Sequence, residues 1–201
     1  MEKEFHFGTQ KRIGDAGEAF LTRCYARAGL VTATELSHDR LILSDALMVL
    51  TLNRQLIPGK LTKVELKTDT YSFNRSKNFF IEAISNEGAQ TLGGPWRAVK
   101  DGIKYYVYLY QSAGVFYWFD AATLKRRMQV LIEAHGLTTV RVLNQKRYGG
   151  SYYTLGYKIP RSWLWDIAER VEVFDSACNG ELLKLGSTVY AHPLVPAAGG
   201  N

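Results

Sequence analysis

The chain has 201 residues, of which 46% are hydrophobic and 22% are charged, the composition of an ordinary globular protein. This length favours one domain with a sizeable core, and with no run of about 18 apolar residues we expect no membrane span. The formal net charge of +6 suits a polyanionic partner such as a nucleic acid. The 2 cysteines and 4 scattered histidines give neither a disulfide framework nor zinc-ligand spacing. An oxygen-ligated site for a hard metal ion remains the candidate.

The N-terminal part predicts a short arm followed by a long helix. Residues 1–5 have neither the apolar core nor the cleavage pattern of a secretory signal, so we expect a cytoplasmic protein. Apolar residues recur at helical spacing from about residue 9 to residue 28, and Gly29 is a typical helix end. Glu18 lies at the margin of the apolar stripe. There it either reaches a site at a sheet edge or is solvated.

An acidic residue follows in a segment that would normally exclude it. Residues 30–36 read as a first strand, and Asp45 then falls inside the almost wholly apolar run 41–50. Carboxylates are seldom buried unless they are paired or bind a metal. The Pro58-Gly59 step predicts a turn that folds the Asp45 strand back, antiparallel, on the strand that follows.

The following strand contains the run Val64-Glu65-Leu66-Lys67. Side chains two apart in a strand share a face, so Glu65 and Lys67 project together. A carboxylate, a free backbone carbonyl and an ammonium in this order can hold a divalent cation and orient a water molecule, as in metal-assisted phosphodiester hydrolysis. The tripeptide by itself is more typical of a surface strand with a weak ion pair.

The polar segment 68–78 reads as a loop that carries Arg75 and Lys77. These cations either touch phosphates or only make the loop soluble. In the next strand, 79–85, Glu82 shares a face with Phe80 and Ile84. It is either a further residue of the metal site or an edge carboxylate.

The second half predicts further strands and basic segments. We expect strands at 105–110 and 115–120, an amphipathic helix at 121–134, strands at 140–143 and 152–159, and a short helix at 162–170. Arg97, Lys100 and Lys104 precede the strand 105–110, and Lys146 and Arg147 lie near the tip of the hairpin between the strands 140–143 and 152–159. They are either phosphate contacts or a solvated face. The candidates for contact with a nucleic acid are Arg75, Lys77, Arg97, Lys100, Lys104, Lys146 and Arg147.

Together, Glu18, Asp45, Glu65 and Lys67 resemble the PD-(D/E)xK nuclease superfamily. The segment Phe79-Phe80-Ile81-Glu82-Ala83-Ile84-Ser85-Asn86, the later Gly94-Pro95-Trp96, the aromatic strand 104–110 and the segment 157–164 are similar to phage-type members of that superfamily. The resemblance spans residues 12–164, with one departure, since Ser44 precedes Asp45 where a proline is usual. It implies an α/β fold with a central mixed β-sheet flanked by helices. The restriction-endonuclease-like core would cover residues 9–120 of a single domain, and a basic, β-rich and helical extension would cover 121–190.

The resemblance also implies a chemistry. Asp45, Glu65 and the carbonyl of Leu66 would bind Mg²⁺ or Mn²⁺, with Glu18 as an outer or second-metal ligand, and Lys67 would orient the attacking water. The implied activity is that of an endonuclease acting on DNA in phage or mobile-element DNA processing or recombination, in the cytoplasm of the bacterial host. The sequence has no obvious segment that would contact base edges in a groove, so structure-selective or weakly specific cleavage is expected. Paired incisions would favour a symmetric homodimer.

Two alternatives remain open. A catalytically inactive DNA-binding or inhibitory protein could keep the same fold, and it would bind DNA equally well in EDTA. A metal-dependent enzyme could act instead on another phosphoester or on a modified nucleotide.

Overall fold

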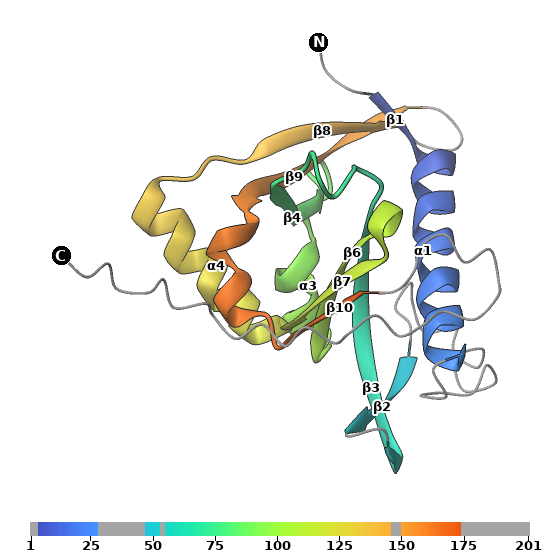
Figure 1. Cartoon of the computed structure of the whole chain (residues 1–201). Coiled ribbons are helices and arrows are strands. Elements are labelled where there is room, and N and C mark those ends of the chain that lie inside the picture. The colour runs from blue at the N-terminus through green and yellow to red at the C-terminus, as the bar shows by residue number, and fades with distance from the viewer. Residues whose placement is uncertain (1–3, 28–46, 53–54, 146–149, 174–201) are drawn as a thin grey trace.

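The computed structural model describes residues 4–27, 47–52, 55–145 and 150–173 (Figure 1). In chain order these form β1 (Glu4–His6), α1 (Phe7–Arg27), β2 (Leu47–Leu52), β3 (Gln55–Asp69), β4 (Asn78–Asn86), β5 (Thr91–Leu92), α3 (Gly94–Lys100), β6 (Tyr105–Tyr110), β7 (Val115–Asp120), α4 (Ala121–His135), β8 (Val140–Gln145), β9 (Ser151–Pro160) and β10 (Arg170–Val173). Short 3₁₀ turns span Gln111–Ala113, Arg161–Trp163 and Trp165–Ile167. The α/β class predicted from the sequence is confirmed. None of the described helices is long and apolar enough to span a bilayer.

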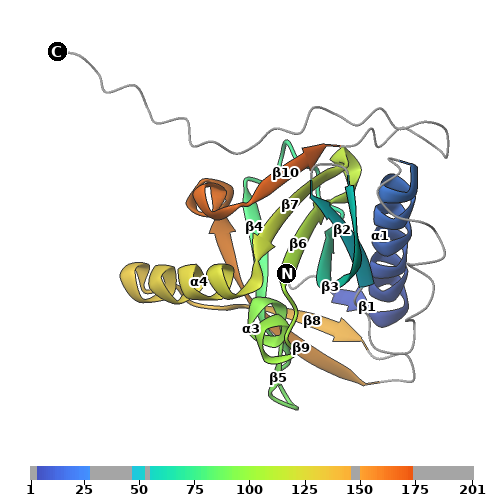
Figure 2. The ribbon, with the colours of Figure 1, turned by 90° about the horizontal axis from the view of Figure 1, so that it is seen from below.

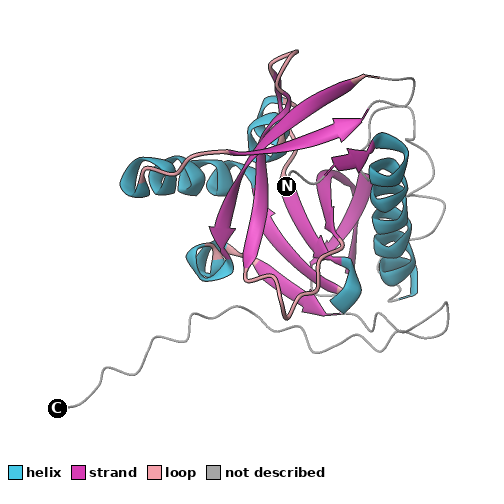
Figure 3. Ribbon diagram, turned by 90° about the horizontal axis from the view of Figure 1, so that it is seen from above, coloured by secondary structure: helices cyan, strands magenta, loops and turns pink. Residues whose placement is uncertain are grey.

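The strands form two sheets. In the first, which we call the β3 sheet, the strand order is β10-β7-β6-β3-β2, and β3 runs parallel to β6 but antiparallel to β2. In the second, the β4 sheet, the order is β1-β8-β9-β4-β5, and β4 lies antiparallel between β9 and β5. Figure 3 shows the strands of the two sheets running at an angle to each other, with α1 to one side.

The core lies where the two sheets meet, and the aromatic strands β6 and β7 fill it. Tyr106, Tyr108 and Tyr110 point toward the β4 sheet, where the ring centroid of Phe79 lies 4.9 Å from that of Tyr108. The opposite face of the β3 sheet is covered by α1, whose Phe20 stacks on Phe116 with 5.8 Å between ring centroids. Because both faces of β6 and β7 are buried, these strands are apolar or aromatic at nearly every position.

Helix α1 approaches β3 closely at one glycine. A Cβ atom on Gly17 would lie 1.9 Å from Oγ1 of Thr68, so only glycine allows the helix to lie this near to the strand. The strand β1, directly before α1, pairs with β8 of the other sheet. The N-terminal segment therefore touches both sheets, as the view from below also shows (Figure 2).

Helix α4 has a capping residue at each end. The side chain of Asp120 accepts a hydrogen bond of 2.8 Å from the Thr123 N–H, and Gly136 ends the helix in the left-handed conformation at φ 57°. Leu124, Met128 and Leu131 are buried on its inner face. The predicted helix 121–134 is confirmed.

Three predictions differ from the structure. The single central sheet is two sheets, because β4 pairs with β9 rather than with β3. Pro58 and Gly59 do not form the predicted turn but lie inside β3, where residues 57–60 stand opposite Leu50 at a shift of register. Such an irregularity accommodates a proline, which has no N–H for the strand ladder. The predicted helix 162–170 is a pair of 3₁₀ turns that leads into β10. The predicted strand 30–36 and Asp45 lie outside the described residues.

Candidate functional site: a lysine and carboxylates between the two sheets

Glu65 and Lys67 share one face of β3, as predicted. The parallel register sets Glu65 opposite Tyr106 and Lys67 opposite Tyr108 of β6. Those tyrosines belong to the core that faces the β4 sheet. The two charged side chains therefore lie on the face of β3 that is turned toward β4, and Thr68 lies on the face that contacts α1.

Lys67 meets a carboxylate from the other sheet. Its Nζ lies 3.4 Å from Oε2 of Glu82, and the two side chains are 34% and 19% exposed. The same ammonium lies 6.0 Å from the ring centroid of Phe80, two residues before Glu82 on β4. The ion pair is half-buried, so solvent screens it less than a surface pair while a solute can still reach it. The sequence left the role of Glu82 open, and the structure places its carboxylate next to the Lys67 ammonium.

Two glycines hold Glu82 in place. The N–H of Gly93 donates a hydrogen bond of 2.8 Å to the carbonyl of Ala83, and a Cβ on Gly93 would lie 2.6 Å from Cγ of Glu82. Gly94 has φ 47°, and a Cβ there would lie 2.3 Å from the carbonyl oxygen of Glu82. Only residues without a side chain let the start of α3 press against β4 at this point.

A buried hydroxyl lies next to the carboxylates. Tyr106 is 1% exposed, and its hydroxyl has no hydrogen-bond partner in the part of the chain that the structure describes. Burial raises the pKa of Tyr106 well above its usual value, and the negative charges of Glu82 and Glu65 raise it further. Burial and Glu82 likewise raise the pKa of Tyr152. Both phenols therefore stay neutral donors at physiological pH, beside acceptor groups.

A second tyrosine ties three strands together at one end of the site. The hydroxyl of Tyr108 donates to Oδ2 of Asp69 over 2.6 Å and accepts the N–H of Phe80 over 3.1 Å. This single hydroxyl connects β6, β3 and β4. It fixes the end of β3 from which the loop 70–77 departs.

The other predicted site residues fall in several places. Glu18 is half-buried on α1, directly after Gly17, the residue that packs on β3, and Leu66 is half-buried in β3. Asp45 lies outside the described residues, so its predicted place beside Glu65 stays a prediction. Within residues 4–27, 47–52, 55–145 and 150–173, no three Asp, Glu, His or Cys side chains gather into a group that could hold a metal ion.

The predicted DNA-contact residues also lie in different surroundings. Arg75, Lys77 and Lys100 are exposed. Arg97 lies 3.3 Å from Asp101, and Lys104 forms an ion pair with Asp120 that raises the pKa of Lys104. The remaining two, Lys146 and Arg147, lie outside the described residues.

Sequence reasoning did not predict the contacts of Arg161, which holds the loop after β3. Its guanidinium lies 3.9 Å from the ring centroid of Phe73 and donates to the carbonyl of Phe73 over 3.1 Å. Its backbone N–H donates to the carbonyl of Lys77 over 2.8 Å. No local pattern pointed to these contacts, because the partners of Arg161 lie on a distant segment of the chain.

Searches of family models, curated proteins and solved structures found no match to this chain.

Proposed function

We propose that this protein is a Mg²⁺- or Mn²⁺-dependent deoxyribonuclease that hydrolyses phosphodiester bonds of DNA, on a restriction-endonuclease-like core. The observation that carries the proposal is the placement of Glu65 and Lys67 on one face of β3, with Glu82 3.4 Å from the lysine. Two features support the finer fold. The strand with the Glu-x-Lys motif lies in a mixed sheet beside the parallel strand β6, and the helix with Glu18 packs on that strand.

The donor set of the chain fits a hard cation. Asp45, Glu65 and the carbonyl of Leu66 would hold it through oxygen atoms, which Mg²⁺ and Mn²⁺ prefer. Glu18, on the helix that packs against the other face of β3, would be an outer or second-metal ligand. The buried hydroxyl of Tyr106, which has no partner among the described residues, is a further polar atom beside two of the carboxylates. A bound cation would polarise the scissile phosphate and lower the pKa of a water molecule.

The chain's own residues supply orientation and charge. Lys67 orients the attacking water and offsets the negative charge that grows on the phosphate in the transition state. The carboxylate of Glu82, 3.4 Å away, directs the ammonium of Lys67 to one place. Arg75 and Lys77, exposed in the loop after β3, contact the phosphates of the DNA backbone.

The same proposal includes the type of substrate, the cellular location and the oligomeric state. The net charge of +6 suits a polymer of phosphates rather than a small substrate. We place the protein in the cytoplasm of a bacterial host, in phage or mobile-element DNA processing. A homodimer is the expected form if the enzyme cuts two strands.

The proposal is tested by incubating the wild type and Glu65→Ala with supercoiled plasmid, a single-stranded circle and a four-way junction, each with Mg²⁺, Mn²⁺ or EDTA. We expect metal-dependent products from the wild type alone. Lys67→Ala should abolish cleavage and keep DNA binding, whereas Lys11→Ala, which breaks an exposed pair with Asp15 on α1, should cleave normally. Cleavage by Glu65→Ala at the wild-type rate would refute the assignment. DNA binding equally strong in EDTA, with no cleavage of any substrate, would favour the inactive DNA-binding protein.

A further inference from the structure

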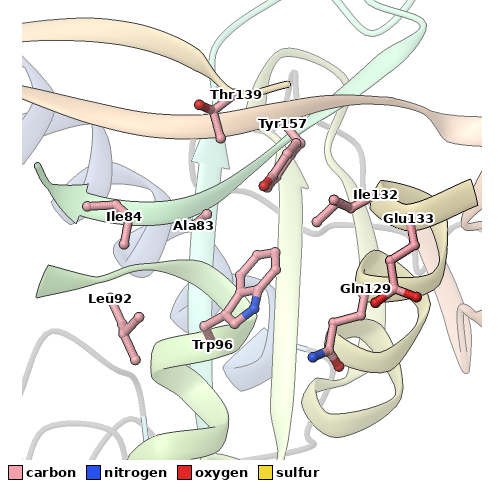
Figure 4. A pocket seen from close by; sticks show the side chains of 9 residues that line it. All are labelled: Ala83, Ile84, Leu92, Trp96, Gln129, Ile132, Glu133, Thr139 and Tyr157. Atoms are coloured by element: carbon pink, nitrogen blue, oxygen red, sulfur yellow. The ribbon is translucent and has the colours of Figure 1, made fainter. Parts of the chain in front are cut away.

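A cavity of about 330 Å³ is lined by residues of β4, β5, α3, α4 and β9 (Figure 4). Its volume falls within the range of small-molecule sites. Ala83 and Ile84 form part of its wall. Because Ala83 directly follows Glu82 on β4, the cavity adjoins the strand that contributes to the candidate site.

Two aromatic side chains dominate the cavity. Trp96 of α3 and Tyr157 of β9 have their ring centroids 6.2 Å apart, with 35° between the ring planes. Both are half-buried, so part of each ring remains accessible from the cavity. Aromatic side chains with accessible surface are the groups on which unpaired bases stack.

Polar groups line the α4 side. Gln129 and Glu133 are four residues apart, hence on one face of the helix, and both border the cavity (Figure 4). An amide and a carboxylate can accept hydrogen bonds from the exocyclic amino group of adenine, cytosine or guanine.

Two lysines lie on the helices that line the cavity, one turn beyond the lining residues. Lys100 follows Trp96 by four residues on α3, and Lys125 precedes Gln129 by four residues on α4, an offset of about 6 Å along each helix. The N–H of Ala121 donates to the carbonyl of Lys104 over 2.9 Å, so α4 begins beside the segment that follows α3. Both lysines are therefore at the same end, opposite Glu133.

We propose that this cavity binds one unpaired base of a DNA strand, stacked on Trp96 and Tyr157, with the attached phosphate at Lys100 and Lys125. The inference rests on the proposed nuclease function and names its substrate class, which is single-stranded or locally unpaired DNA. Gln129 and Glu133 form hydrogen bonds with the polar edge of the stacked base.

The test measures affinity without cleavage. Fluorescence anisotropy in EDTA gives the Kd of the full chain for labelled oligo(dC), oligo(dT) and a blunt duplex. We expect Trp96→Ala to weaken oligo(dC) binding about tenfold, the effect of losing one stacked base. Gln129→Ala should weaken it several-fold, and duplex binding should not change. Val130→Ala, which removes a neighbouring side chain that is 59% exposed on α4, is the matched control and should bind like the wild type.

The outcomes distinguish a failure of the base site from a failure of the proposed nuclease function. Wild-type affinity in both Trp96→Ala and Gln129→Ala would overturn the base site, whether or not the protein cleaves DNA. If Trp96→Ala does not fold, the exposed Gln129 decides the question. The expected pattern of affinities together with no cleavage by the wild type would keep the base site and refute the nuclease.

Discussion

Lys67 and Glu82 meet across the junction of the two sheets, with 3.4 Å between Nζ and Oε2, although their strands share no pairing partner. The pair is thus a tertiary contact, which depends on how one sheet is set against the other. Any change that shifts β4 relative to β3 should act on Lys67 as well.

The first prediction concerns Glu82→Gln, which removes the negative charge and keeps the side-chain shape. We expect the rate of metal-dependent DNA cleavage to fall by roughly tenfold or more, the usual effect of losing a group that orients a catalytic one. The Kd for DNA should stay the same. Glu87→Gln, which breaks a 2.6 Å pair with Arg141, is the matched control. A Glu82→Gln enzyme as fast as the Glu87→Gln enzyme would contradict the role given to Glu82.

The second prediction compares two glycines with positive φ. Gly94 and Gly102 have φ 47° and 68°, but a Cβ on Gly94 would lie 2.3 Å from the carbonyl oxygen of Glu82, whereas a Cβ on Gly102 would meet nothing within 4 Å. Thermal or urea unfolding should show that Gly102→Ala lowers the free energy of unfolding by about 1 kcal/mol, the cost of the backbone conformation. Gly94→Ala should lower it further and also slow cleavage. Equal destabilisation by both would show that the contact with Glu82 has no effect.

The third prediction contrasts two buried tyrosines. Tyr108→Phe removes a 2.6 Å hydrogen bond to Asp69 and leaves the Phe80 N–H without its acceptor, so we expect a loss of about 2 kcal/mol in urea unfolding. Tyr106→Phe removes a hydroxyl that has no partner among the described residues. The free energy of unfolding of Tyr106→Phe should equal that of the wild type or be slightly higher. A Tyr106→Phe protein as unstable as the Tyr108→Phe protein would mean that the Tyr106 hydroxyl makes an important contact.

The fourth prediction is a loss of stability in alkali. Burial raises the pKa of Tyr106, Tyr108, Tyr110 and Tyr117 in the folded protein. Above pH 10, roughly the pKa of an unfolded tyrosine, the unfolded state binds fewer protons than the folded state. The free energy of unfolding is therefore unaffected by these groups below that pH. It falls above it by about 1.4 kcal/mol per pH unit for each tyrosine that stays protonated.

The measurement is urea unfolding between pH 8 and 11.5. Tyr108→Phe should flatten the alkaline slope, while Tyr71→Phe, at a side chain that is 50% exposed, should leave the slope unchanged. A slope that is the same in the wild type and Tyr108→Phe would contradict the assignment.

The fifth prediction concerns the approach of α1 to β3. Gly17→Ala would place a methyl group 1.9 Å from Oγ1 of Thr68, and we expect a loss of about 1–3 kcal/mol from overpacking, despite the better helix propensity of alanine. Thr68→Ala removes that oxygen and should restore part of the loss in the double variant. Gly14→Ala, where a Cβ would meet nothing within 4 Å, is the control on the same helix and should be neutral or stabilising. A double variant no more stable than Gly17→Ala would show that another contact is responsible.

Local patterns predicted the elements that depend on neighbouring residues. The spacing of apolar side chains predicted α1 and α4, and the two-residue period of a strand predicted the common face of Glu65 and Lys67. These features need no information from distant parts of the chain.

The features that sequence reasoning missed are non-local. The pairing of β4 with β9, which divides the fold into two sheets, joins segments separated by α3, β6, β7 and α4. The contact of Arg161 with Phe73 follows from that pairing, whereas the contact of Lys67 with Glu82 depends on how the two sheets pack against each other. The turn predicted at Pro58-Gly59 was wrong because the same dipeptide suits both a turn and an irregular strand. The register of the partner strand decides between the two.

The pairing of β4 with β9 also has a consequence for synthesis on the ribosome. The strand with Glu65 and Lys67 can pair once β6 has emerged, but β4, which contributes Glu82, must wait for residues 151–160. Until then its apolar residues Phe79 and Ile81 have only part of the core to cover them. Non-local pairing of this kind slows folding and leaves a strand edge exposed. In a nascent chain that stalls before β9, β4 would lack its main pairing partner, so the contact of Lys67 with Glu82 should form only after residues 151–160 have emerged.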